Sequence, residues 1–81
     1  MNINTVAIDD TVLALLFLTL HDENRAWKCI DWAALNRLHD RGLIDDPVNK
    51  AKSVILTGEG LRESERLFNQ YFVATSKEPN L

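Results

Sequence analysis

The sequence predicts one small domain of the α+β class, mainly α-helical with a small β-hairpin. Leu, Ile, Val and Phe account for 25 of the 81 residues, which is enough to build one packed core. Three stretches repeat apolar side chains at helical spacing, two of them before Gly42 and one after Gly58. Between these glycines lie two short runs of β-prone residues, separated by residues that favour a turn. The expected order is therefore helix, short element, helix, hairpin, helix.

The first predicted helix begins at Asp9 or Asp10, since either carboxylate can accept hydrogen bonds from the free amides at a helix N-terminus. It continues through the sequence TVLALLFLTLH and ends near His21. Only Thr19 is polar in the stretch from residue 12 to residue 20. A helix that is apolar on nearly every side lies at the centre of a core or is covered by a second subunit.

The second predicted helix spans residues 31–41, with Asp31 as its N-cap and Gly42 as the left-handed residue that ends it. Trp32 recurs with two leucines on the apolar face of this helix, so we expect Trp32 in the core. The preceding residues, 22–30, fit a short helix and a short strand equally well.

The residues after Gly42 change from helical to β spacing. Leu43-Ile44 and residues 53–56 are the two predicted strands of the hairpin, and Asp46-Pro47 favours the turn between them. Thr57 is the expected N-cap of the last helix. The apolar stripe of that helix consists of Leu61, Ser64, Leu67, Phe68, Tyr71 and Phe72.

This order of elements matches a winged-helix-like domain, in which residues 31–41 form the recognition helix and residues 45–52 form the wing. We expect residues 9–72 to form this single domain. Residues 1–8 then make an N-terminal extension and residues 73–81 a flexible C-terminal tail.

Two resemblances accompany this pattern. The run GLIDDPVNKAKSVILTGEGLRESERLF resembles the end of the recognition helix, the wing and the following helix of bacterial winged-helix regulators. A longer set, IDDTVLALLFLTLHD through RAWKCIDWAALNRLHDRGLIDDP to KAKSVILTGEG, is similar to a bacterial family of small stand-alone proteins of unknown function. The second resemblance covers most of residues 8–72 and implies no activity.

A duplex-binding surface would lie on the recognition helix and the wing, where Asn and Arg side chains reach base edges and Lys side chains reach phosphates. The candidate contacts are Asn36, Arg37, Arg41, Lys50 and Lys52. However, the wing also carries Asp45 and Asp46, the charges of residues 21–41 cancel, and the chain has a net charge of −3. This balance weakens the attraction for phosphates on which DNA binding depends.

We expect no catalytic site, no cofactor and no metal. Cys29 has no evident base nearby to activate it, and the histidines of His21-Asp22 and His39-Asp40 sit near helix ends, where they interact favourably with the helix dipole. A single cysteine and the absence of a basic segment before an apolar run favour the cytoplasm. The longest apolar run is too short to cross a membrane, so we expect no membrane association.

An interaction surface is predicted on the apolar first helix and on the stripe of the last helix. Its candidate residues are Leu16, Leu20, Trp27, Leu61, Phe68 and Phe72. Trp27 fits a core position and a binding anchor about equally well. The charge balance favours a protein-interaction or assembly module that forms a homodimer or binds an unidentified protein. The order of elements favours the alternative, a dimeric DNA-binding module.

Overall fold

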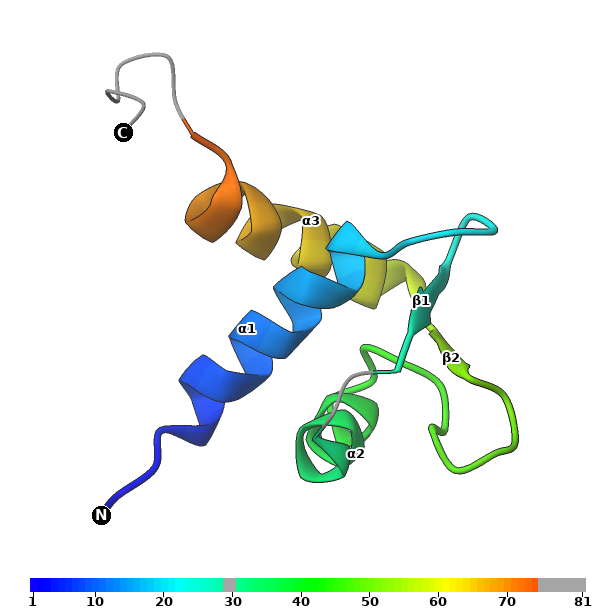
Figure 1. Cartoon of the computed structure of the whole chain (residues 1–81), viewed down its shortest axis with the longest axis horizontal. Helices are drawn as coiled ribbons and strands as arrows, with labels where there is room; N and C mark the ends of the chain where they lie inside the picture. Colours follow the sequence, from blue (N-terminus) through cyan, green and yellow to red (C-terminus); the bar gives the residue numbers. More distant parts are fainter. Residues whose placement is uncertain (29–30, 75–81) are drawn as a thin grey trace.

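The computed structural model describes residues 1–28 and 31–74. The elements are α1 (Thr5–Leu18), β1 (Arg25–Trp27), α2 (Trp32–Asp40), β2 (Ser53–Ile55) and α3 (Gly58–Phe72). Three helices and a two-stranded antiparallel sheet make a small α+β domain, which confirms the predicted fold class. Helix α1 runs through the middle of the molecule and contacts α2, α3 and β1 (Figure 1).

Helix α1 begins at Thr5, before the predicted start at Asp9 or Asp10. Asn4 is the N-cap, and its side-chain Oδ1 accepts a hydrogen bond from the Ala7 amide at 3.0 Å. Residues 5–8, expected in an extension, therefore form the first turn of the helix. The prediction that Asp9 or Asp10 caps the helix is wrong, because both lie inside α1, where Asp9 is buried. The helix also ends at Leu18, before the predicted end at His21.

The segment that fitted both helix and strand contains β1. A tight turn over residues 22–24 precedes it, in which Asp22 and Glu23 have φ angles of 49° and 71°. Such left-handed conformations are uncommon for residues other than glycine. β1 pairs with β2 in antiparallel register, with Ala26 opposite Val54. The expectation also extended to residues 29–30, which lie outside the described residues.

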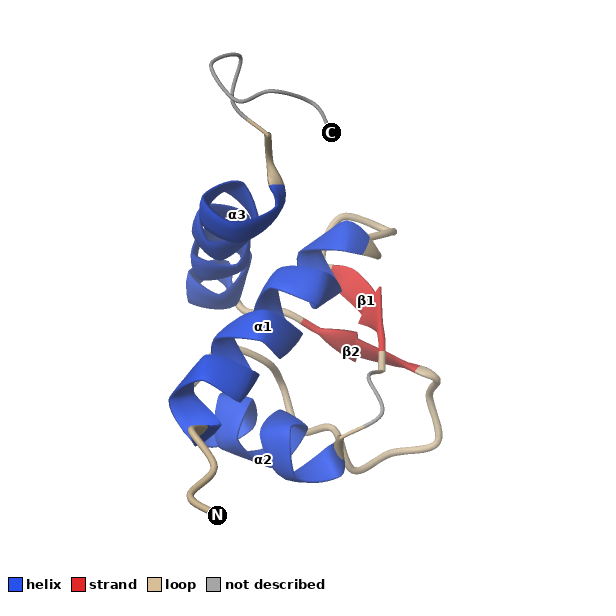
Figure 2. Cartoon of the chain, turned by 60° about the vertical axis from the view of Figure 1, so that its left-hand side comes forward, coloured by secondary structure: helices blue, strands red, loops and turns tan. Residues whose placement is uncertain are grey.

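The predicted hairpin pairing is present but short. Ile44 and Leu56 form a single antiparallel bridge, and the Asp45 amide donates to the Ile55 carbonyl at 2.8 Å. The longer ladder of β2 is made with β1, which is distant in the sequence. Figure 2 shows this small sheet beside the C-terminal end of α1. The wing segment is thus the loop that leads into β2.

Local signals at the ends of α2 and α3 are confirmed. The Asp31 side chain accepts from the Ala33 amide at 3.3 Å, and the Thr57 hydroxyl accepts from the Gly60 amide at 3.0 Å. Gly42 has a φ of 75°, as a helix-ending glycine requires. A Cβ atom at Gly60 would collide with the Leu43 carbonyl, so this glycine allows α3 to approach the preceding chain.

The core lies between α1, α3 and the inner face of the sheet. Its members are apolar side chains from every element: Leu13, Ala14, Leu16, Ala26, Leu35, Leu38, Leu43, Ile44, Val54, Leu56 and Leu67. The prediction that Trp32 belongs to this core is wrong, since the residue is 50% exposed. It begins α2 at the edge of the domain, where the Lys28 ammonium lies 5.2 Å from its ring centroid.

The ends of the chain complete this description. Most of the expected tail, residues 75–81, lies outside the described part of the structure. Among the residues that are described, no helix is long and apolar enough to cross a membrane.

Candidate interaction surface

One side of α1 is apolar and is left largely uncovered by residues 1–28 and 31–74. The residues on this side, here called the α1 stripe, are Ala7, Ile8, Thr11, Leu15 and Leu18. Their spacing of three and four residues places them on one helix face. Leu15 and Leu18 are 39% and 63% exposed, whereas Leu16, between them in sequence, is 0% exposed. The prediction that Leu16 belongs to an interaction surface is therefore wrong, because its side chain points into the core.

The α1 stripe offers no charge and little free hydrogen-bonding capacity. Its one polar residue, Thr11, donates its hydroxyl hydrogen to the Ala7 carbonyl at 2.8 Å. Near the N-terminal end of the stripe, a shallow depression of about 280 Å³ is lined by Ala7, Ile8, Thr11 and Val12. Surfaces of this kind favour apolar partners, because polar groups placed against them would lose water without gaining hydrogen bonds.

A second apolar surface lies at the end of α3. Leu67 packs in the core and is 1% exposed, but Tyr71, one turn later on the same helix face, is 53% exposed. Tyr71, Phe72 and Val73, here called the α3 overhang, extend beyond the part of α3 that α1 covers. Aromatic rings connect it to α1, with centroid distances of 5.2 Å from Phe17 to Phe68 and 5.8 Å from Phe68 to Phe72.

The other predicted interaction residues fall into separate places. Leu20, Leu61 and Phe68 are half-buried and pack against the core. Trp27 is exposed on the sheet and stacks on His21, with 4.4 Å between the ring centroids. The structure thus joins Phe68 and Phe72 in one aromatic cluster and leaves Trp27 on a different surface.

The two arginines predicted to contact DNA face α1. Arg37 forms a bidentate ion pair with Asp9, with Nε to Oδ2 at 2.7 Å and Nη2 to Oδ1 at 2.8 Å. The hydrogen bond to Asp9 raises the pKa of the Arg37 guanidinium above its ordinary value. Arg41, the C-cap of α2, lies one helical turn beyond Arg37, with its Nη1 4.0 Å from Asp10 Oδ1. These contacts place a carboxylate near each of the two arginines.

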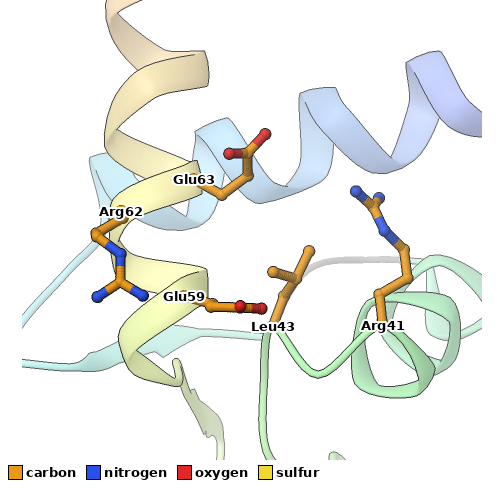
Figure 3. Close-up of a pocket in the computed structure, with 5 residues that line it drawn as sticks. All are labelled: Arg41, Leu43, Glu59, Arg62 and Glu63. Carbon is orange, nitrogen blue, oxygen red and sulfur yellow. The ribbon is translucent and has the colours of Figure 1, made fainter.

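Arg41 also lines a polar pocket of about 400 Å³, together with Leu43, Glu59, Arg62 and Glu63 (Figure 3). Arg66 forms an ion pair with Glu63, which lowers the pKa of Glu63 and raises the pKa of Arg66. Two arginines face two glutamates around this pocket. The balance leaves no excess charge to select a phosphate or a cation.

The remaining candidates for DNA contact are exposed, and acidic residues share the loop that carries two of them. Asn36 lies on the outer side of α2, while Lys50 and Lys52 lie on the loop that precedes β2. Asp45 and Asp46 are exposed on that same loop. The sequence did not predict that Asp9 lies near Arg37 and Asp10 near Arg41. The spacing of Arg37 and Arg41 on one helix face was the available signal.

The two histidines lie against backbone carbonyls. Each histidine has its Nδ1 near a backbone carbonyl, at 3.1 Å from Thr19 O for His21 and 3.0 Å from Ile44 O for His39. Across residues 1–28 and 31–74, no three His, Cys, Asp or Glu side chains gather into a possible metal site. Cys29 lies outside the described residues.

Comparison with known proteins gives the family. Over 72 residues, the chain is 64% identical to the uncharacterized protein y4hR of Sinorhizobium fredii (strain NBRC 101917 / NGR234), which covers 89% of this chain and 97% of that bacterial relative. No solved structure matches the chain. Residues 4–74 match a domain of unknown function, DUF6429. The matched region contains all five elements of the fold, and the chain belongs to the DUF6429 family.

Proposed function

We propose that this protein is an interaction module that associates with a second copy of itself through the α1 stripe. The observation that carries the proposal is the exposure of Leu15 and Leu18 on a helix face without charge, in a chain of which 26% is charged. Contiguous exposed apolar surface in a small soluble domain is typical of protein-binding sites.

The size of the exposed apolar surface supports a weak dimer. Large side chains that are half-exposed contribute on the order of 100 Å² each, so the α1 stripe and the α3 overhang together offer roughly 500 Å² per copy. Stable complexes bury about 800 Å² per partner. We therefore expect a reversible dimer that dissociates on dilution.

The test is the effect of Leu18→Glu on molar mass, measured by size-exclusion chromatography with light scattering. Leu18 is 63% exposed, so the substitution places a charge on the α1 stripe without disturbing the core. We expect the wild type to shift towards dimer as concentration rises, and the variant to remain a folded monomer. Asn36→Glu adds the same charge on the exposed side of α2 and is expected to dimerise like the wild type.

A monomeric wild type at every concentration would contradict the proposed self-association. A Leu18→Glu variant that dimerises as strongly as Asn36→Glu would place the interface elsewhere. Circular dichroism of both variants verifies that neither has unfolded.

DNA binding is the less supported alternative. Arg37 and Arg41 are held near Asp9 and Asp10, which reduces the positive charge available to phosphates. If the loop before β2 contacts DNA, Lys50→Glu/Lys52→Glu will abolish salt-sensitive binding of a fluorescent duplex, measured by anisotropy. Under the present proposal the wild type gives no such binding.

We propose that the protein acts in the cytoplasm. A protein with one thiol, Cys29, is suited to the reducing cytoplasm. Its role there is to bind another copy, without catalysis and without a cofactor.

A further inference from the structure

We infer that the α3 overhang of each copy docks into the depression on the α1 stripe of the other copy, across a two-fold axis. This inference rests on the proposed self-association and adds the contact that builds it. The group that binds in the depression is an aromatic side chain of the second copy, supplied by Tyr71 and Phe72.

The two surfaces are chemically matched. The depression at Ala7, Ile8, Thr11 and Val12 has a volume of about 280 Å³ and is lined by small and apolar groups. The overhang presents the rings of Tyr71 and Phe72, which lie 6.4 Å apart and are both half-exposed. Aromatic anchors that fill an apolar pocket carry much of the binding energy at protein interfaces.

Position within the fold permits a reciprocal contact. Figure 1 shows the N-terminal half of α1 and the last turn of α3 on the same side of the molecule. A two-fold axis on that side brings the overhang of one copy to the α1 of the other. The same rotation brings the overhang of the second copy to α1 of the first copy. An interface of this kind uses one patch twice and closes as a dimer.

Charge explains why a second copy would dock at this place. Each copy carries a net charge of −3, so two copies repel one another at a distance. The overhang lies in a stretch without charged residues, 67–74. The two acidic residues within the stretch that forms the depression, Asp9 and Asp10, lie near Arg37 and Arg41 of the same copy. Docking of the overhang into the depression therefore brings no further carboxylate against Asp9 and Asp10.

The experiment is disulfide cross-linking between two single-cysteine variants of the full chain. Thr11→Cys and Val73→Cys, which leave Tyr71 and Phe72 in place, are each made in a Cys29→Ser background, mixed and exposed to mild oxidation. A disulfide forms only when the two Cα atoms are within about 7 Å, so it reports direct proximity. We expect cross-linked dimer in the mixture and loss of that product when either variant is oxidised alone.

The outcomes separate this inference from the proposed function. If Thr11→Cys alone gives as much cross-linked dimer as the mixture, two α1 stripes pack on each other, and the reciprocal docking is wrong while self-association stands. If light scattering shows dimer but no cross-link forms in any tube, docking at the depression is likewise wrong. If light scattering shows only monomers of folded protein, the proposed function itself fails.

Discussion

The two sides of α1 both carry leucines but have very different surroundings. On one side Leu13, Ala14 and Leu16 are fully buried by α3 and the rest of the core. On the other side Leu15 and Leu18 are exposed to solvent. Leucines therefore occupy both sides of one helix, and the difference comes from what the remaining chain is able to cover.

The difference shows how a small domain uses an apolar helix. A chain of this length buries only part of its apolar surface, because its surface is large for its volume. α1 contacts α2, α3 and β1, and these elements cover its inner side. The α1 stripe on the other side stays exposed to solvent, and only another molecule can bury it. Variants that act on one side only can test this division.

The largest expected effect comes from a charge on the buried side. Leu16→Glu places a carboxylate in the core. The free-energy cost of burying this unpaired charge exceeds the free energy of unfolding of a small domain. We expect loss of the folded state, observed as the loss of a cooperative thermal transition by circular dichroism.

The matched control is the neighbouring residue, Leu15. Leu15→Glu places the same charge on the α1 stripe, and we expect a monomer whose stability lies within about 1 kcal/mol of the wild-type monomer. Equal effects of the two substitutions on folding would remove the distinction between the two sides.

A smaller effect is expected at the ion pair between α1 and α2. Asp9 is buried and accepts two hydrogen bonds from Arg37, whereas Asp10 lies 4.0 Å from Arg41. Asp9→Asn removes a charge-assisted contact on the covered side and is expected to cost about 1–2 kcal/mol of unfolding free energy. Urea denaturation of dilute, monomeric protein gives this value.

Asp10→Asn is the comparison for that pair. Its contact with Arg41 is longer and closer to solvent, so we expect a change of about 0.5 kcal/mol or less. If the two substitutions cost the same, the Asp9 ion pair does not contribute specifically to holding α1 against α2.

The smallest effect is expected at Glu63, which is not part of the α1 stripe. Its ion pair with Arg66 is exposed, so Glu63→Gln should change stability by about 0.5 kcal/mol or less. The pair lowers the pKa of Glu63 below its ordinary value of 4.5. The contribution is therefore present above pH 4.5 and is lost as the pH falls through the lower folded-state value. Urea titrations of both proteins across this range should converge at acidic pH.

Local features of the fold were predictable from the sequence, whereas contacts between distant residues were not. Asp31, Thr57 and Gly42 act within one helical turn, and all three take their predicted roles. Asp9 was mistaken for a cap because its partner, Arg37, is 28 residues away in the sequence. The pairing of β1 with β2 was missed for the same reason.

The candidate surface was predicted in outline and not in its residues. An apolar helix with nearly uniform sides gives no periodicity from which to separate Leu15 from Leu16. Only the packing of α3 and the sheet against α1 decides which leucines stay exposed. Tyr71 and Phe72 were recognised as part of an apolar stripe, but the sequence does not show where α1 stops covering it.

The central claim is that the uncovered side of α1 binds a second copy. Sedimentation equilibrium of the wild-type protein over a wide concentration range tests it most directly. The account predicts an apparent mass that rises from 9.2 kDa towards twice that value as the concentration increases. A mass of 9.2 kDa at every concentration would contradict the claim, because the α1 stripe would then be uncovered in the free protein.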